Sequence, residues 1–308
     1  MIDVCLLGTG GMMPMPERYL SSMMIRYKGR LIMVDCGEGT QVTLKEKGWG
    51  FKAIDAILFT HYHADHISGL PGMLLAIANA KREEPLKLIG PKGLVEVVTA
   101  LRTIASELTF PIEFIVLDDN NEDIIINEIS VKYAKAEHSV DCVSYRFDLL
   151  RPGKFNVKAA EALDLPRNYW SQLQKGENIK YNGKLYTPSM VMGDTREGIS
   201  ISYCTDSRPY KGLADFARNS DLFICEGMYG SDEKRDKAEL NKHMLFSEAA
   251  KTALEANVKL LWLTHFSPAL SDPEEYSEAV KEIFNETVVG HDRMSASFYF
   301  DGRVVYTD

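Results

Sequence analysis

The stretch FTHYHADHISG, residues 59–69, brings four side chains of metal-ligand type, His61, His63, Asp65 and His66, within six residues. His61 and His63 are two positions apart on an expected extended turn, so both rings can face one cation. Asp65 and His66 can then face a second position beside it. Imidazole together with carboxylate suits zinc, and manganese or iron can replace it where carboxylates contribute. The spacing predicts a two-metal site rather than a polar loop of exposed histidines.

The segments around this stretch predict an α/β protein. The apolar run AIDAILFT, residues 53–60, has the length of a buried strand and ends next to His61. Binding residues of α/β proteins usually follow the C-terminal ends of strands. Three more candidate ligands follow expected strands in the same way: His138, Asp206 and His265. Asp194 precedes its strand and is therefore left out of the predicted ligand set.

Asp35 ends a second expected strand, in the hairpin SSMMIRYKGRLIMVD, and begins the turn DCGEGTQ. An acid at this place can hold a ligand histidine through its second ring nitrogen, as metal sites generally require. It can equally cap the helix that follows. The sequence leaves both interpretations open.

The chain has 308 residues, of which 45% are hydrophobic and 26% charged, enough for one large α/β domain or two small ones. We expect a cytoplasmic protein without a membrane segment, because the N-terminus lacks a basic leader and no apolar run approaches the ~18 residues of a membrane span. Five scattered cysteines without a C-x-x-C pair indicate reduced thiols. The net charge of −9 argues against a surface broadly dedicated to nucleic acid, although it permits a local basic patch.

Residues 151–196 differ from the rest of the chain. They contain scattered Pro and Gly, little apolar periodicity, and eight Lys or Arg against four acids, a balance of +4. We interpret the segment as an inserted arm on a single domain that spans residues 1–308. A solvated loop of ordinary charge is the alternative.

The series HYHADH, His138, Asp206 and His265 resembles the metallo-β-lactamase superfamily, whose fold is a four-layer αββα sandwich. Within it, LLGTGG, VDCGEGTQ, DAILFTHYHADHISGLPGMLL, ICEG and the segment at His243 look like the ribonuclease Z family over nearly the whole chain. This resemblance implies two zinc ions per chain with Asp206 bridging them. The ligands of one zinc would be His61, His63 and His138, and those of the other Asp65, His66 and His265.

The resemblance also implies an endoribonuclease that removes the 3′ trailer of precursor tRNA and leaves a 3′-hydroxyl on the tRNA. The residue types fit this chemistry, because two cations ~3.5 to 4 Å apart can activate water for in-line attack on a phosphodiester. The departing ribose oxygen needs a proton, which His243 can supply. Glu226 would raise the pKa of His243 and fix its tautomer. The expected catalytic residues are Asp65, His243 and Glu226.

A homodimer, in which the arm of one subunit helps to hold RNA for the other, is a further implication of the resemblance. Other functions stay open at this point. One is a phosphodiesterase for cyclic or small nucleotides, which would need no arm, and another is a lactone or β-lactam hydrolase. A metal-containing RNA-binding protein without activity is disfavoured by the complete ligand set.

Overall fold

Two compact units make up the chain in the computed structural model, which describes residues 1–118 and 123–307. The larger unit comprises Met1–Asp148 and Ile199–Asp308, and the smaller one Leu149–Gly198. Within the described residues, none of the helices has the length and apolar character needed to span a membrane.

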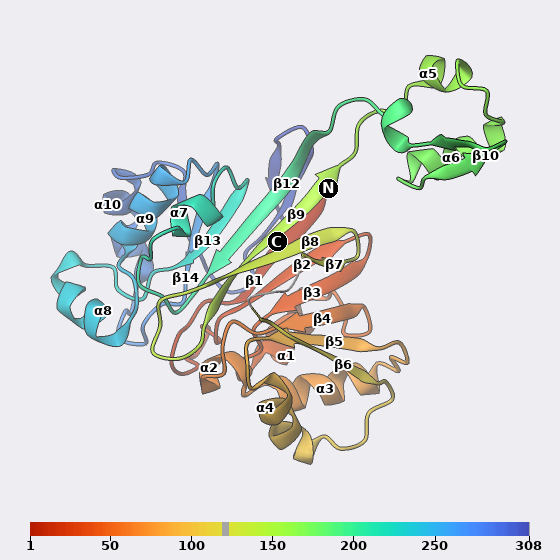
Figure 1. The fold of residues 1–308 in the computed structure, drawn as a ribbon. Coiled ribbons are helices and arrows are strands. Elements are labelled where there is room, and N and C mark those ends of the chain that lie inside the picture. Colours follow the sequence, from red (N-terminus) through yellow and green to blue (C-terminus); the bar gives the residue numbers. More distant parts are fainter. Residues whose placement is uncertain (119–122, 308) are drawn as a thin grey trace. The chain divides into compact units, whose positions relative to one another are not determined.

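The first sheet of the larger unit has eight strands (Figure 1). Their spatial order is β17 (Val304–Tyr306), β16 (Ser295–Phe298), β1 (Ile2–Gly8), β2 (Ser22–Tyr27), β3 (Arg30–Val34), β4 (Ile54–Leu58), β5 (Leu86–Gly90) and β6 (Ile112–Val116). Strands β1, β2 and β3 are antiparallel neighbours, whereas β3 to β6 run parallel. The parallel strands therefore end at one common edge.

The second sheet has seven strands. Their order is β15 (Thr287–Val289), β14 (Leu261–Thr264), β13 (Leu222–Glu226), β12 (Arg196–Cys204), β9 (Val143–Arg151), β8 (Ile129–Lys135) and β7 (Ile124–Ile126). Strands β12 to β15 run parallel. The two sheets face each other, because the ring of Trp262 on β14 lies 6.2 Å from that of Phe298 on β16.

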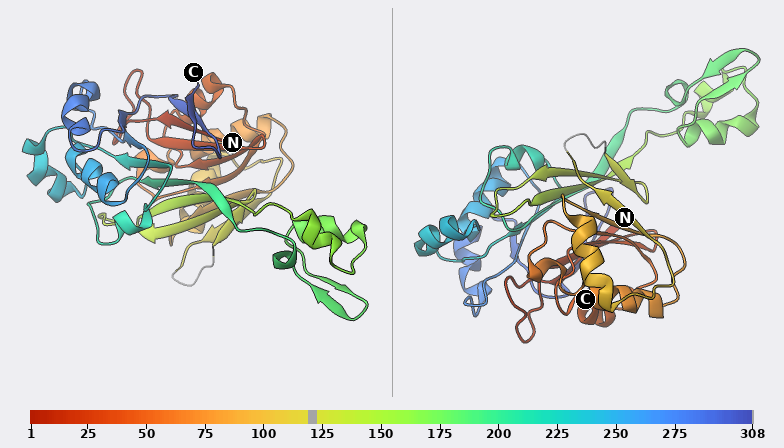
Figure 2. Two further views of the ribbon diagram at one scale, coloured as in Figure 1. Left: turned by 90° about the horizontal axis from the view of Figure 1, so that it is seen from above. Right: turned by 60° about the horizontal axis from the view of Figure 1, so that its bottom comes forward.

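Helices cover the outer face of each sheet (Figure 2). Those on the first sheet are α1 (Thr40–Lys47), α3 (Leu70–Asn79) and α4 (Leu94–Leu101), which continues as the 3-10 turn η1 (Arg102–Ile104). Those on the second are α7 (Leu213–Phe216), α9 (Phe246–Glu255) and α10 (Ser277–Lys281), which follows the 3-10 turn η5 (Pro273–Tyr276). This four-layer arrangement confirms the predicted αββα sandwich.

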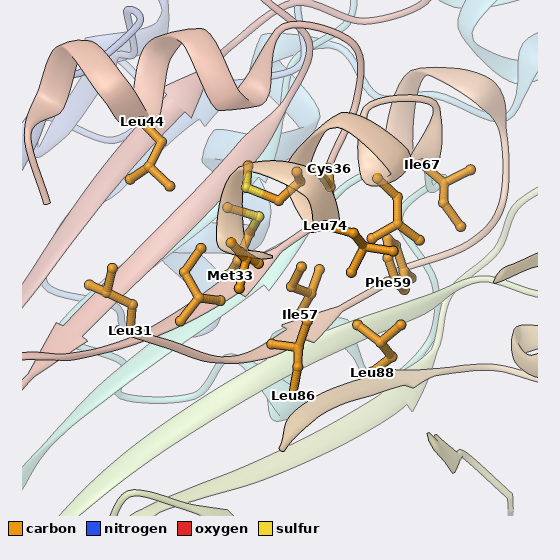
Figure 3. Close-up of a cluster of buried hydrophobic side chains, with 14 of the residues drawn as sticks. Leu31, Met33, Cys36, Leu44, Ile57, Phe59, Ile67, Leu74, Leu86 and Leu88 are labelled. Carbon is orange, nitrogen blue, oxygen red and sulfur yellow. The ribbon is translucent and has the colours of Figure 1, made fainter. Parts of the chain in front are cut away.

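The core between the first sheet and its helices explains why these strands form (Figure 3). Along β3, Leu31 and Met33 face the helices, and the equally buried Ile32 and Val34, which alternate with them, face the other sheet. A strand buried on both faces needs an unbroken apolar run, which β3 has. Each fully buried side chain of this size contributes roughly 1.5–3 kcal/mol.

The hairpin predicted for residues 21–35 is present, with its turn at Lys28–Gly29 joining β2 to β3. A second hairpin turns at Asn127–Glu128 and joins β7 to β8. The charged segment after β13, whose letters SDEKRDKAELNK suggest a loop, forms the 3-10 turn η4 (Asp232–Lys234) and then α8 (Arg235–Asn241). Ala238 alone is buried on α8. A helix with a single buried residue has no apolar period from which it could be predicted.

The smaller unit has regular structure that its composition did not indicate. It contains α5 (Val157–Glu161), η2 (Arg167–Tyr169), α6 (Trp170–Gln174), a hairpin of β10 (Ile179–Tyr181) and β11 (Lys184–Tyr186), and η3 (Pro188–Met190). A core of its own holds these elements: Ala160, Leu165, Leu173, Ile179, Tyr186 and Val191.

Candidate metal centre

The strand ends of both sheets deliver the side chains of the site. Asp35 follows β3, and His61 follows β4, its parallel neighbour. In the second sheet Asp206 follows β12, Glu226 ends β13 and His265 follows β14, again on parallel neighbours. The short helix α2 (Ala64–Ile67) carries Asp65 and His66.

One group of potential ligands consists of His61, His63, His138 and Asp206, with ligand atoms within 4.8 Å of one another. The Nδ1 of His63 lies 2.9 Å from His61 Nε2 and 3.3 Å from His138 Nε2. Asp206 Oδ2 lies 3.8 Å from His61 Nε2 and 3.7 Å from His138 Nε2. These are the four residues expected around the first cation.

The second group consists of Asp65, His66, His265 and again Asp206, also within 4.8 Å. The other oxygen of Asp206, Oδ1, lies 3.1 Å from His66 Nε2 and 3.0 Å from His265 Nε2. Asp65 Oδ2 lies 3.6 Å from His66 Nε2. The structure therefore brings all seven predicted ligands together, and Asp206 belongs to both groups.

The second group contains buried polar atoms without a hydrogen-bond partner among the described residues: His66 Nε2, His265 Nε2 and Asp206 Oδ1. Buried polar atoms are nearly always satisfied, so three that converge on one point require an explanation. Nitrogen and carboxylate oxygen lone pairs facing one another are the donor set of a divalent cation. The residues present fit such an ion.

The opposite nitrogens of the histidine rings are held by partners, as in metal sites generally. His66 Nδ1 lies 2.8 Å from Asp35 Oδ2, and His265 Nδ1 lies 3.0 Å from Ser21 Oγ. The N-cap of α1 is Gly39, which makes no side-chain capping bond. Of the two roles open for Asp35, the structure thus shows the contact to a ligand histidine.

The backbone is unusual at three of these positions. Asp35, Asp206 and His265 have φ of 58°, 50° and 60°, in the left-handed region that costs a non-glycine residue energy. The backbone of Gly11 also packs closely against the His265 ring, because a Cβ added at Gly11 would lie 2.8 Å from His265 Nε2. Such strain is typical of functional sites, where the surrounding fold maintains it.

The pKa shifts in the first group favour the protonation states that bind a cation, a neutral imidazole and an ionised carboxylate. Burial, together with the neighbouring His66, lowers the pKa of His61 to about 2, so its imidazole is neutral. Burial opposes ionisation of Asp206, but His265 and His66 hold its pKa well below the ordinary value. Burial likewise opposes protonation of His66, yet the carboxylates of Asp206 and Asp35 raise its pKa well above normal. The second group therefore favours a positive charge.

His243 lies beside both groups without belonging to either. Its ring centroid is 5.5 Å from that of His138 and 5.7 Å from that of His265. Its Nδ1 lies 3.0 Å from Oε2 of the fully buried Glu226. Burial works against protonation of His243, but the charge of Glu226 prevails and raises its pKa to about 9. The segment from His243 onward has the composition of a helix in the sequence, but α9 begins only at Phe246, three residues after His243.

Arg208 supports His243 and was missed from the sequence. It donates from Nη1 to the carbonyl oxygen of His243 at 2.6 Å. Its guanidinium also forms a bidentate salt bridge with the carboxylate of Glu248, at 2.7 and 2.6 Å. Glu248 in turn accepts a hydrogen bond from the backbone N–H of Leu245. The position of Arg208 two residues after Asp206 is the only sequence signal for this role.

Comparison with known proteins gives full-length relatives. The chain is 50% identical to a protein named Ribonuclease Z from Lachnoclostridium phytofermentans, over 98% of this chain and 99% of the relative. It is 53% identical to the Ribonuclease Z of Clostridium acetobutylicum, over 95% and 97%. A family model described as Anti-Pycsar protein Apyc1 matches residues 2–155.

Solved structures share the fold. The short form of human tRNase Z superimposes with a TM-score of 0.67 at 23% identity, covering 96% of this chain and 98% of that one. The metallo-β-lactamase fold protein YhfI from Bacillus subtilis has a TM-score of 0.69 at 18% identity, with the same coverage. At these identities the likeness concerns the metallo-β-lactamase fold alone.

Proposed function

The chain belongs to the ribonuclease Z family and is a metal-dependent endoribonuclease, and we propose that it removes the 3′ trailer of precursor tRNA. The observation that carries this proposal is the identity of 50% over 98% of the chain to a protein named Ribonuclease Z. The converging donor atoms around Asp206 support a reaction assisted by metal ions.

Two zinc ions per chain are part of the proposal, with manganese or iron as substitutes. His61, His63 and His138 would hold one ion, Asp65, His66 and His265 the other, and Asp206 both. When bound, two such ions activate water and neutralise charge on the phosphate. The two ligand groups with their shared carboxylate support this assignment.

His243 is the proposed general acid. The bond that breaks joins phosphorus to the ribose 3′-oxygen, so this oxygen leaves with the tRNA and the phosphate stays on the trailer. An alkoxide is a poor leaving group, and a proton delivered to it from the imidazolium of His243 lowers the barrier. Glu226 keeps that imidazolium charged and holds Nδ1, which directs the other nitrogen, Nε2, toward the substrate.

Residues 151–196 are proposed as an inserted arm on a single domain, and the compact unit Leu149–Gly198 supports this. The balance of +4 within a chain of net charge −9 favours contact with the RNA backbone. We propose further that the protein is a cytoplasmic homodimer, in which each arm holds RNA for the partner subunit.

A direct test compares three substrates with zinc-loaded protein: a precursor tRNA, a cyclic nucleotide and a nitrophenyl phosphodiester. We expect cleavage of the precursor at one position with the highest kcat/KM of the three. Asp206→Ala serves as the inactive control. A preference for the cyclic nucleotide, with random or absent cleavage of the precursor, would replace this proposal by the small-nucleotide phosphodiesterase.

A further inference from the structure

A hollow of about 190 Å³ lies over the loops that follow β13, which ends at Glu226, and β14, which precedes His265. Its lining includes Met228, Tyr229, Lys234, Lys237, Leu270 and Tyr276, and we call it the lysine pocket. Its volume is below the roughly 300 Å³ at which pockets for whole small ligands begin. The lysine pocket therefore suits one part of a larger substrate.

Met228 connects the lysine pocket to the proposed reaction centre. A Cβ placed on Gly11 would lie 2.9 Å from Met228 Cε and 2.8 Å from His265 Nε2, so both side chains border the same small space. Met228 also follows Glu226 by two residues, and its carbonyl oxygen accepts from the N–H of Ser267, two residues after His265. The pocket is one side chain away from the second ligand group.

Two aromatic residues line the lysine pocket: Tyr276, which is half-buried, and Tyr229, of which only 7% is exposed. The ring of Tyr276 packs directly on Gly230, where an added Cβ would come within 2.4 Å of it. The ring of Tyr229 lies 5.4 Å from the ammonium of Lys237. An accessible aromatic ring stacks on nucleobases of any sequence, which contributes roughly 1–3 kcal/mol per base. Of the two rings, that of Tyr276 is the more accessible.

The two lysines of the pocket carry charge that the protein does not neutralise. Lys234 and Lys237 are exposed, and neither forms an ion pair within residues 1–118 and 123–307. Arg235, between them in sequence, is by contrast paired with Asp232 and Glu248. Two ammonium groups without an ion-pair partner, one of them over the ring of Tyr229, are suited to a phosphate attached to a base.

We propose that the lysine pocket binds the nucleotide next to the scissile phosphate, with its base against the ring of Tyr276 and its phosphate near Lys234 and Lys237. This inference rests on the proposed function, because it requires an RNA substrate at the metal centre. The bound nucleotide belongs either to the tRNA end or to the first position of the trailer. Both have the same chemistry, and the substrates below distinguish them.

The test uses the full chain with three variants. Lys234→Ala/Lys237→Ala removes the charges, and Ala269→Trp fills the pocket from an exposed position in its lining. Lys251→Ala, at an exposed position of α9 outside the pocket, is the matched control. Each is assayed on three precursor tRNAs, one intact and two with an abasic residue immediately 5′ or 3′ of the cleavage site. Thermal unfolding is measured on every variant.

On the intact precursor we expect the double lysine variant to raise KM roughly tenfold and to weaken its salt dependence. Ala269→Trp should lower kcat/KM by roughly 10-fold or more, as loss of one stacked base does. On one of the two abasic precursors, Ala269→Trp and the wild-type protein should have the same kcat/KM, because the base that the pocket binds is already missing. That precursor identifies the bound nucleotide.

If the control and both pocket variants behave alike on the intact precursor, the lysine pocket does not bind RNA. The same conclusion follows if Ala269→Trp causes an equal loss on all three precursors. If Ala269→Trp fails to fold, the double lysine variant still tests the proposal. A KM and a salt dependence equal to those of the wild-type protein would contradict RNA binding in the lysine pocket. If instead the wild-type protein leaves the intact precursor uncut, the proposed function fails, and that outcome is distinct from failure of the pocket.

Discussion

Asp206 differs from every other proposed ligand because its two carboxylate oxygens face different groups. Oδ1 lies near His66 and His265, and Oδ2 lies near His61 and His138. The left-handed backbone at Asp206 directs its short side chain to this position at the end of β12. The proposed bridging role therefore depends on this single residue.

We predict that the purified protein carries close to two transition-metal ions per chain and that Asp206→Ala loses at least one of them. Removal of the shared carboxylate takes one oxygen ligand from each ion. Asp194→Ala is the matched control, because Asp194 is an exposed carboxylate outside both groups. Elemental analysis of both variants checks this, and an Asp206→Ala protein with the wild-type metal content would contradict the bridge.

His243→Ala should retain both metals but lower turnover of precursor tRNA by roughly 10²- to 10⁴-fold, the usual contribution of a positioned general acid. On a nitrophenyl phosphodiester the loss should be much smaller, because nitrophenolate departs without a proton. Glu226→Gln should give a milder form of the same pattern, since the imidazole stays in place. Paired kinetics with metal analysis on the same samples provide the test. Metal loss, or equal losses on the two substrates, would make His243 a ligand or a structural residue.

At the scale of elements, a network anchored on α9 holds the loop that carries His243. Arg208 links the carbonyl of His243 to Glu248 on α9, and Lys242 offers its own carbonyl oxygen 3.3 Å from His138 Nδ1. The loop between α8 and α9 thus contacts both a proposed metal ligand and the proposed acid. The position of this loop therefore sets the position of His243, the proposed proton donor.

We predict that Arg208→Ala lowers kcat on precursor tRNA by roughly tenfold, because the His243 loop loses a charge-assisted hydrogen bond. Arg208→Lys should restore part of the loss, since it keeps the charge without the planar fork. In a protein that already carries His243→Ala, adding Arg208→Ala should not lower kcat further, because the position of the loop matters only while the imidazole of His243 is present. Arg218→Ala, an exposed arginine that pairs with Asp215, is the control. Additive losses in the double variant would assign Arg208 to the fold instead.

His61 and His265 could be predicted because each follows a strand that is buried along its whole length. The strand after which His61 stands has five buried residues in succession, a pattern visible in the sequence. Helix α8 and the elements of the smaller unit could not be predicted in this way. They are three to seven residues long, and α8 buries only Ala238, so packing and ion pairs hold them rather than an apolar period. Arg208 was missed for a similar reason, since its partners are 35 and 40 residues away in sequence.

At the scale of the whole molecule, charge is unevenly divided between the two units. The chain carries −9 in total, whereas residues 151–196 have eight basic residues against four acids. An acidic protein that acts on RNA needs such a local excess of positive charge for the backbone phosphates.

We predict that replacing residues 154–192 by a short Gly-Ser linker weakens cleavage of precursor tRNA but spares a nitrophenyl phosphodiester. The design is feasible because Gly153 and Gly193 approach closely, with a Cβ on Gly153 only 1.9 Å from the carbonyl oxygen of Gly193. Activity of the wild-type protein on precursor tRNA should fall more steeply with salt than that of the deletion variant. Equal losses on the two substrates would show that the segment supports the fold.

In the proposed reaction, this metal centre cleaves precursor tRNA so that the 3′-oxygen departs with a proton from His243. The most direct measurement identifies both new ends after cleavage of one precursor tRNA by the zinc-loaded protein. We predict a 3′-hydroxyl on the tRNA and a 5′-phosphate on the trailer, at a single position. A 3′-phosphate or a 2′,3′-cyclic phosphate on the tRNA would mean that the opposite phosphorus–oxygen bond breaks, and it would contradict the mechanism.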